Sequence, residues 1–80
     1  MIRYGKETKK DTDKVLEAAV EYFGPEGQGL EITERDDCHV NFRGGGGFVS
    51  LQVCGENGTT KIDLSAREWE HQAQEFIARV

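Results

Sequence analysis

The chain has 80 residues, of which 36% are hydrophobic and 31% charged, and its formal net charge is −5 at pH 7. A chain of this length forms one domain with a small core, and no apolar stretch approaches the ~20 residues of a membrane-spanning helix. The 15 acidic residues outnumber the 10 basic ones, which disfavours nucleic-acid binding because phosphate contacts need clustered Lys and Arg. The first residues lack an apolar signal segment, and two cysteines are too few for a disulfide framework. We therefore expect one cytoplasmic domain over residues 1–80, with neither a membrane nor a nucleic-acid partner.

The beginning of the chain predicts a short strand followed by a helix. Ile2 and Tyr4 alternate with polar or small residues, which is typical of a strand with one buried face. Asp11 or Thr12 can cap the helix, and Gly24-Pro25 is expected to end it, with the glycine in the left-handed conformation. The apolar stripe of this helix consists of Val15, Leu16, Ala19, Val20, Tyr22 and Phe23.

Four further strands are predicted from segments in which apolar and polar residues alternate. Their apolar positions are Leu30 and Ile32; Cys38, Val40 and Phe42; Val49, Leu51 and Val53; and Thr60, Ile62 and Leu64. The turns set the register, because a shift of one residue would exchange the two faces of a strand. A four-residue loop over Gly44–Gly47 keeps apolar residues opposite each other, and a three-residue loop over Arg35–Asp37 sets Ile32 opposite Val40. Asn57-Gly58 predicts a hairpin whose loop has either two or four residues.

The chain is predicted to end in a second helix. Ser65-Ala66-Arg67-Glu68 matches a capping box, and the apolar stripe that follows consists of Trp69, Ala73, Phe76, Ile77 and Val80. Each helix has one apolar stripe and each strand one apolar face, so both helices are expected on the same face of the sheet. The predicted fold class is α+β, in the order strand, helix, four-stranded antiparallel meander, helix.

This order of elements resembles the fold of the TATA-binding-protein repeat and a shortened form of the helix-grip fold of START and Bet v 1-like proteins. Thr12-Asp13-Lys14-Val15 after the first strand, and a C-terminal helix with Trp69 and Phe76, are similar in style to helix-grip proteins. The resemblance covers most of the chain at the level of topology. It implies a fold, and a fold does not by itself imply an activity.

The polar sides of the strands predict an open sheet face. Its expected rows are Glu31, Asn41, Ser50 and Asp63, and Thr33, His39, Gln52 and Lys61. Arg43 is expected beside Phe48, next to a flexible glycine loop that can let a partner approach closely. The candidate binding residues are Thr33, His39, Asn41, Arg43, Gly45, Gly46, Phe48, Ser50 and Gln52.

The sequence predicts no catalytic residue, metal site or cofactor. The cysteines and histidines match no familiar zinc spacing. Cys38 is expected to be a small buried side chain and Cys54 to be exposed on the other face, which argues against a disulfide. His39 is expected to be a solvated strand residue, and Asp36-Asp37 to form a turn.

Two hypotheses of different classes follow from these observations. The first is a non-catalytic binding or protein-interaction module that uses the open face, with self-association through that face or an edge strand as a related form. The alternative is a small-molecule-binding or enzymatic domain of reduced helix-grip type. Its pocket would lie between the last helix and the sheet, lined by Trp69, Phe76, Leu51 and Ile62.

Overall fold

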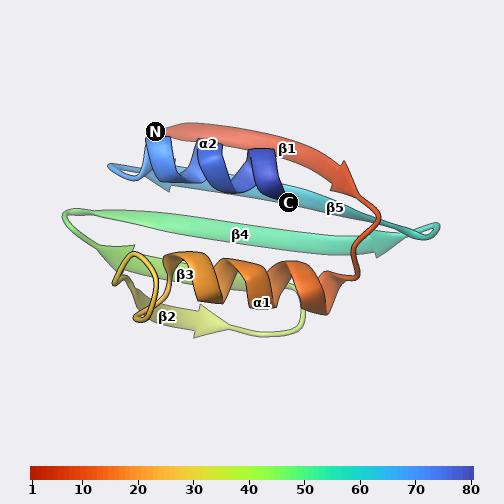
Figure 1. Cartoon of the computed structure of the whole chain (residues 1–80), viewed down its shortest axis with the longest axis horizontal. Helices are drawn as coiled ribbons and strands as arrows, with labels where there is room; N and C mark the ends of the chain where they lie inside the picture. The colour runs from red at the N-terminus through yellow and green to blue at the C-terminus, as the bar shows by residue number, and fades with distance from the viewer.

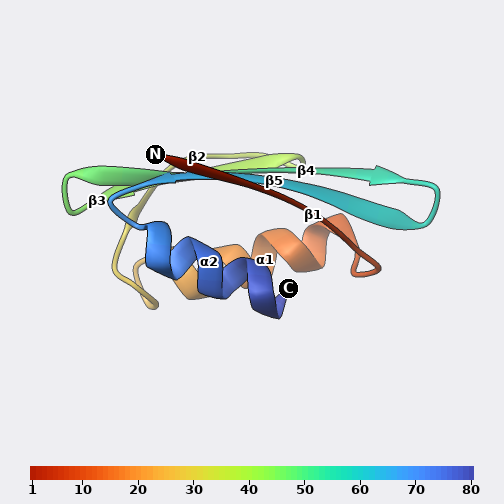
Figure 2. The same ribbon diagram turned by 90° about the horizontal axis from the view of Figure 1, so that it is seen from above.

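The structure, a computed structural model, describes all residues from 1 to 80. Five strands and two helices follow one another as β1 (Ile2–Thr8), α1 (Thr12–Phe23), β2 (Glu31–Arg35), β3 (His39–Gly44), β4 (Gly47–Glu56), β5 (Thr59–Arg67) and α2 (Glu70–Arg79). The strands form one antiparallel sheet in the order β1-β5-β4-β3-β2 (Figure 1). Both helices cover the same face of this sheet (Figure 2). The predicted α+β fold and its element order are therefore confirmed.

The hydrophobic core lies between the two helices and the sheet. It is one cluster of 16 buried residues, to which α1 contributes Val15, Leu16, Ala19 and Phe23 from its predicted stripe. The ring of Phe23 lies 5.5 Å from that of Phe42 in β3 and 5.3 Å from that of Phe76 in α2, measured between centroids. Burying a side chain of this size contributes roughly 1.5–3 kcal/mol, so Phe23 joins three elements at the centre of the fold. Neither helix is long and apolar enough to cross a membrane.

The glycine segment between β3 and β4 is a tight turn rather than the predicted four-residue loop. Gly44 pairs with Gly47, and only Gly45 and Gly46 lie outside the ladder, with φ angles of 58° and 81°. Two successive positive φ values define a hairpin turn that matches the twist of the strands. Gly47 is required for another reason, because a Cβ atom there would overlap the carbonyl oxygen of Arg67. The predicted pairing of apolar residues across β3 and β4 is nevertheless confirmed, with Phe42 opposite Val49 and Val40 opposite Leu51.

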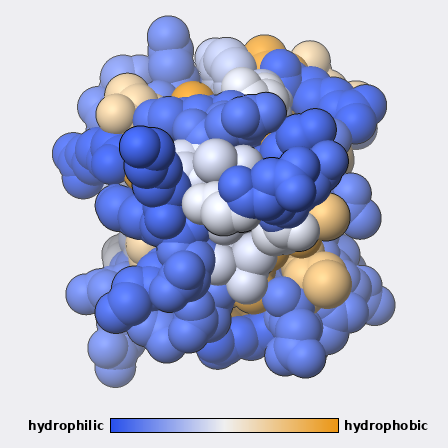
Figure 3. Space-filling view, turned by 90° about the vertical axis from the view of Figure 1, so that its right-hand side faces the viewer, coloured by the Kyte–Doolittle hydropathy of each residue, from blue (hydrophilic) through white to orange (hydrophobic).

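The Asn57-Gly58 hairpin between β4 and β5 is also a two-residue turn. Glu56 pairs with Thr59, and Asn57 and Gly58 have φ angles of 51° and 80°. This result decides between the two loop lengths that the sequence left open. Figure 3, which looks at this end of the molecule, shows a mainly hydrophilic surface.

A bulge interrupts β2, and it changes the predicted register. Ile32 lies opposite Phe42 rather than Val40, and Glu34 lies opposite Asn41, with Thr33 as the extra residue between them. The predicted loop over Arg35–Asp37 is therefore wrong. An extra residue on one strand reverses the alternation beyond it, which a strict two-residue period cannot anticipate.

The turn that joins β2 to β3 consists of Asp37 and Cys38. It is closed by the backbone N–H of Asp36, which donates to the carbonyl oxygen of His39 at 2.9 Å. Cys38 is exposed in this turn, so its predicted burial in the core is wrong. The reason is that the pairing with β3 continues along β2 to Asp36, which is paired with His39, so Cys38 is left in the turn instead of in β3.

α1 begins and ends differently from the sequence prediction. Asp11 occupies the cap position of α1, but its side chain makes no capping hydrogen bond. Gly24 is extended, with φ −67° and ψ −172°, rather than left-handed. A glycine is still needed there, since a Cβ atom would overlap the carbonyl oxygen of Val20. The left-handed conformation is taken by Gly29 instead, with φ 86°.

The predicted capping box at the start of α2 is wrong, because β5 extends through Arg67. Ser65 pairs with Ser50 on one side and Arg3 on the other, so cross-strand hydrogen bonding replaces the local cap. The chain leaves the sheet at Glu68, which has a φ of 69°, and the helix starts only at Glu70. Trp69 fixes this corner by donating from Nε1 to the carbonyl oxygen of Gly44 at 2.8 Å.

Candidate functional site

The face of the sheet opposite the helices carries the polar side chains of all five strands. Its rows are Glu31, Arg43, Phe48 and Arg67; Glu34, Asn41, Ser50, Ser65 and Arg3; His39, Gln52, Asp63 and Gly5; and Cys54, Lys61 and Glu7. Three predicted cross-strand pairs are confirmed: Asn41 with Ser50, His39 with Gln52, and Arg43 with Phe48. The predicted positions of Asp63 and Lys61 are each wrong by two residues along β5. Glu31 lies opposite Arg43, because the bulge separates it from the row of Asn41.

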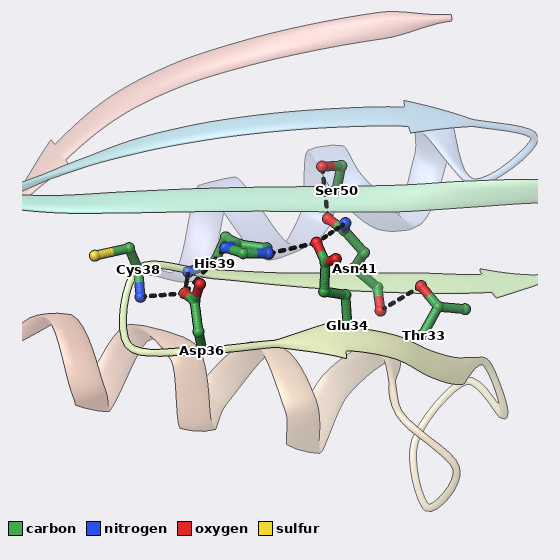
Figure 4. A network of polar contacts seen from close by, with 7 residues as sticks. All are labelled: Thr33, Glu34, Asp36, Cys38, His39, Asn41 and Ser50. Atoms are coloured by element: carbon green, nitrogen blue, oxygen red, sulfur yellow. Dashed lines mark hydrogen bonds and ion pairs between the residues drawn. The ribbon is translucent and has the colours of Figure 1, made fainter.

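His39 is held between two carboxylates at one end of this face (Figure 4). Its Nε2 lies 2.6 Å from Oε1 of Glu34, and its Nδ1 lies 2.9 Å from Oδ1 of Asp36. Each carboxylate accepts a hydrogen bond, so the doubly protonated ring, which donates from both nitrogens, is favoured. The hydrogen bond to Glu34 is the main reason that the pKa of His39 is raised above its ordinary value of 6.5, and the charge of Asp36 adds to it.

Asp36 shapes the turn as well as facing His39. Its Oδ1 accepts hydrogen bonds from the backbone N–H groups of Cys38 at 2.7 Å and His39 at 2.9 Å. These bonds favour the ionised carboxylate, and the one from Cys38 is the largest cause of the lowered pKa of Asp36. The prediction that Asp36 forms a turn is confirmed.

The contacts of Glu34 continue across β3 to β4. Asn41 donates from Nδ2 to Oε1 of Glu34 at 3.4 Å, and Ser50 donates from Oγ to Oδ1 of Asn41 at 2.8 Å. Thr33, the bulge residue, donates from Oγ1 to the carbonyl oxygen of Asn41 at 3.4 Å. The side chains on three neighbouring strands therefore form one connected network, which we call the His39 network: Glu34, Asp36, His39, Asn41 and Ser50.

A shallow depression on the open face extends from Gly5 in β1 across β5 and β4 to Cys38. Gly5 has no side chain, and its neighbours on this face of the strand, Arg3 and Glu7, stand on either side of it. Arg3 donates from Nε and Nη2 to the two carboxylate oxygens of Asp63, at 2.9 and 2.6 Å. This bidentate contact lowers the pKa of Asp63. Lys61 also lines the depression.

The candidate residues from the sequence fall into separate parts of the face. His39, Asn41 and Ser50 belong to the His39 network, and Thr33 joins it through the bulge; Gln52 lines the depression; Arg43, Phe48, Gly45 and Gly46 lie at the glycine turn. Glu34 was missed because strict alternation from Ile32 places it on the core side. The signal for such a bulge is a charged residue at a strand position where the alternation predicts an apolar residue.

The chemistry of the open face is that of hydrogen bonding and charge. Both ring nitrogens of His39 are engaged by carboxylates, so this residue is not free to accept a proton from a substrate. The thiol of Cys54 faces only the carbonyl oxygen of the next residue, at 3.9 Å. No group of three or more His, Cys, Asp or Glu side chains is arranged to hold a metal ion.

The fold and this face define a small α+β domain with two helices on one side of an antiparallel sheet and polar residues on the other. Comparisons with protein-family models, with curated proteins and with solved structures found no match. The functional argument therefore rests on the geometry of the open face.

Proposed function

We propose that this protein is a small, non-catalytic binding module that engages a protein partner through the open face of its sheet. The observation that carries the proposal is the His39 network, which fixes polar side chains of three strands relative to one another. Binding to side chains that are already ordered loses less conformational entropy than binding to mobile ones.

The row at the glycine turn supplies the anchor of this surface. Phe48 is half-buried between Arg43 on β3 and Arg67 on β5, and both arginines are exposed. Neither arginine takes part in any of the ion pairs within the chain. Aromatic and arginine side chains are enriched at the energetic centres of protein interfaces. The matching partner is a segment with an apolar side chain flanked by carboxylates.

The glycine turn supports this role by rigidity rather than by flexibility. Gly45 and Gly46 have positive φ angles, and the carbonyl oxygen of Gly44 accepts a hydrogen bond from Nε1 of Trp69. The turn therefore keeps Arg43 and Phe48 in a fixed register. A rigid support of this kind is what a preformed binding surface needs.

The alternative, a ligand pocket of reduced helix-grip type, is less well supported. The space that it needs between α2 and the sheet holds Phe76, Leu51 and Ile62, which are 3%, 0% and 3% exposed. The likeness to the TATA-binding-protein repeat and to helix-grip proteins remains one of topology. We place the binding role in the cytoplasm, where two exposed, unpaired cysteines stay reduced.

The test is a titration of isotope-labelled protein, followed by amide NMR, with a peptide that carries a leucine between two glutamates and with clarified host lysate. We expect the amides of Arg43, Phe48 and Arg67 to shift while those of α1 stay unchanged. The substitution Arg43→Glu should abolish the shifts, and the matched change Lys14→Glu on the exposed side of α1 should not. Shifts confined to the helices, or equal loss in both variants, would argue against the open face.

A further inference from the structure

β1 forms one edge of the sheet, and its outward backbone groups are unpaired. All seven residues pair with β5 in an unbroken register, from Ile2 opposite Ala66 to Thr8 opposite Thr60. None of the hydrogen bonds outside this ladder uses a backbone group of β1. In Figure 1 the strand lies along the outer margin of the molecule, with no element beyond it. A long, regular edge without proline or bulge is a template for pairing with another strand.

The side chains of this edge are complementary to themselves in one antiparallel register. When Gly5 of two copies is aligned, Arg3 of each copy lies opposite Glu7 of the other, on the same face of the sheet. Tyr4 then lies opposite Lys6, and the whole length of the strand is used. A shift by two residues in one direction sets Lys6 opposite Lys6, and in the other it leaves Arg3 opposite Gly5. Only the register centred on Gly5 pairs every charge on the open face with its opposite.

The helix side of β1 supports the same arrangement. Ile2, Tyr4 and Ile77 are only half-buried against the core, so they form an apolar margin along the edge. Lys6 donates from Nζ to the carbonyl oxygen of Ile77 at 2.7 Å, which holds α2 close to β1. A second copy placed across the edge would bring the two α2 helices side by side and cover this margin.

We propose that two copies of the chain associate through their β1 strands, antiparallel about a two-fold axis at Gly5, to form one continuous sheet. The open faces of both copies then lie on the same side, so this association is independent of the proposed binding function. The two depressions around Gly5 meet at the axis, where neither strand has a side chain.

The register is tested by cysteine cross-linking in a chain carrying Cys38→Ser and Cys54→Ser. Gly5→Cys places two thiols directly opposite each other, and the nearest atom to a Cβ at this position is 3.9 Å away, so the side chain fits. We expect an intermolecular disulfide under mild oxidation. Glu7→Cys is the control, because its two copies lie about 13 Å apart in this register and should not cross-link.

The charge pairing is tested by sedimentation velocity across micromolar to millimolar concentrations. The wild-type chain should dimerise, and Glu7→Arg should raise the dimer Kd by about tenfold, since it sets two pairs of arginines opposite each other. Mixing it with Arg3→Glu should restore a dimer that contains one chain of each. Asp63→Asn removes the internal partner of Arg3 and should leave the dimer intact. A wild-type chain that stays monomeric throughout, or a dimer in which Gly5→Cys fails to cross-link, would overturn the proposal.

Discussion

β2 and β1 are the two edges of one sheet, and they differ in length and regularity. β2 has five residues and a bulge at Thr33, whereas β1 has seven residues in unbroken register, and both strands carry charged side chains. A bulge is one of the means by which proteins prevent edge-to-edge pairing. The difference indicates that β2 is protected from association and that β1 is open to it.

The bulge in β2 has a second consequence, which connects the edge to the open face. Because Thr33 is an extra residue, Glu34 turns to the polar side, where it meets His39 and Asn41. One irregularity therefore both interrupts the edge and completes the His39 network. On β1, where no bulge occurs, the open-face residues alternate without interruption around Gly5.

The largest effect is expected where β2 is attached to the core. Phe42 lies opposite Ile32 of β2, is 1% exposed and packs against Phe23, so Phe42→Ala should cost about 3–5 kcal/mol of unfolding free energy. Urea denaturation followed by circular dichroism measures it. Exposed Lys14→Ala serves as the control with little change. A loss below about 1 kcal/mol would mean that β2 is not held through this contact.

A pair of matched substitutions compares the edges directly. Ile2 on β1 and Ile32 on β2 are both half-buried, and each truncation to alanine should cost about 1 kcal/mol in dilute solution. If β1 pairs with a second copy, the cost of Ile2→Ala should grow with protein concentration, because Ile2 becomes covered in the dimer. Ile32→Ala should cost the same at all concentrations. Equal behaviour of the two variants would remove the distinction between the edges.

Deleting Thr33 should convert β2 into a regular edge with little loss of stability. Without this residue Ile32 and Glu34 would be consecutive and would keep their partners Phe42 and Asn41. The protection that the bulge provides would be lost, so we expect higher oligomers by light scattering, since both edges could then pair. Thr33→Ser, which keeps the bulge, should behave as the wild type.

The sequence correctly predicted features that depend on neighbouring residues, and it failed where pairing between distant strands determines the structure. Asn57-Gly58 forms the hairpin that the dipeptide predicts, and His39 and Asn41 lie on the polar face that alternation assigns. The capping box beginning at Ser65 matched a local pattern, but pairing of Ser65 with two neighbouring strands outweighed it. Glu34 reaches His39 only because of the bulge, so its contact with His39 could be recognised only from the structure.

The smallest effect is expected from the titration of His39. Its pKa is raised in the folded state by Glu34 and Asp36, so its contribution to stability is complete below the ordinary histidine value of 6.5 and is lost as pH rises through the folded value. Asp36 has a lowered pKa, so its contribution is present above its ordinary value of 3.8 and is lost as pH falls through the folded value. The turn between β2 and β3 should therefore be most protected against amide hydrogen exchange at pH values between these two ordinary pKa values.

His39→Gln should remove the loss of protection at higher pH and keep the loss of protection at low pH. An unchanged loss at higher pH in that variant would show that another group causes it. The edge at β1, which contains no histidine, should show no matching change in exchange across the same alkaline range.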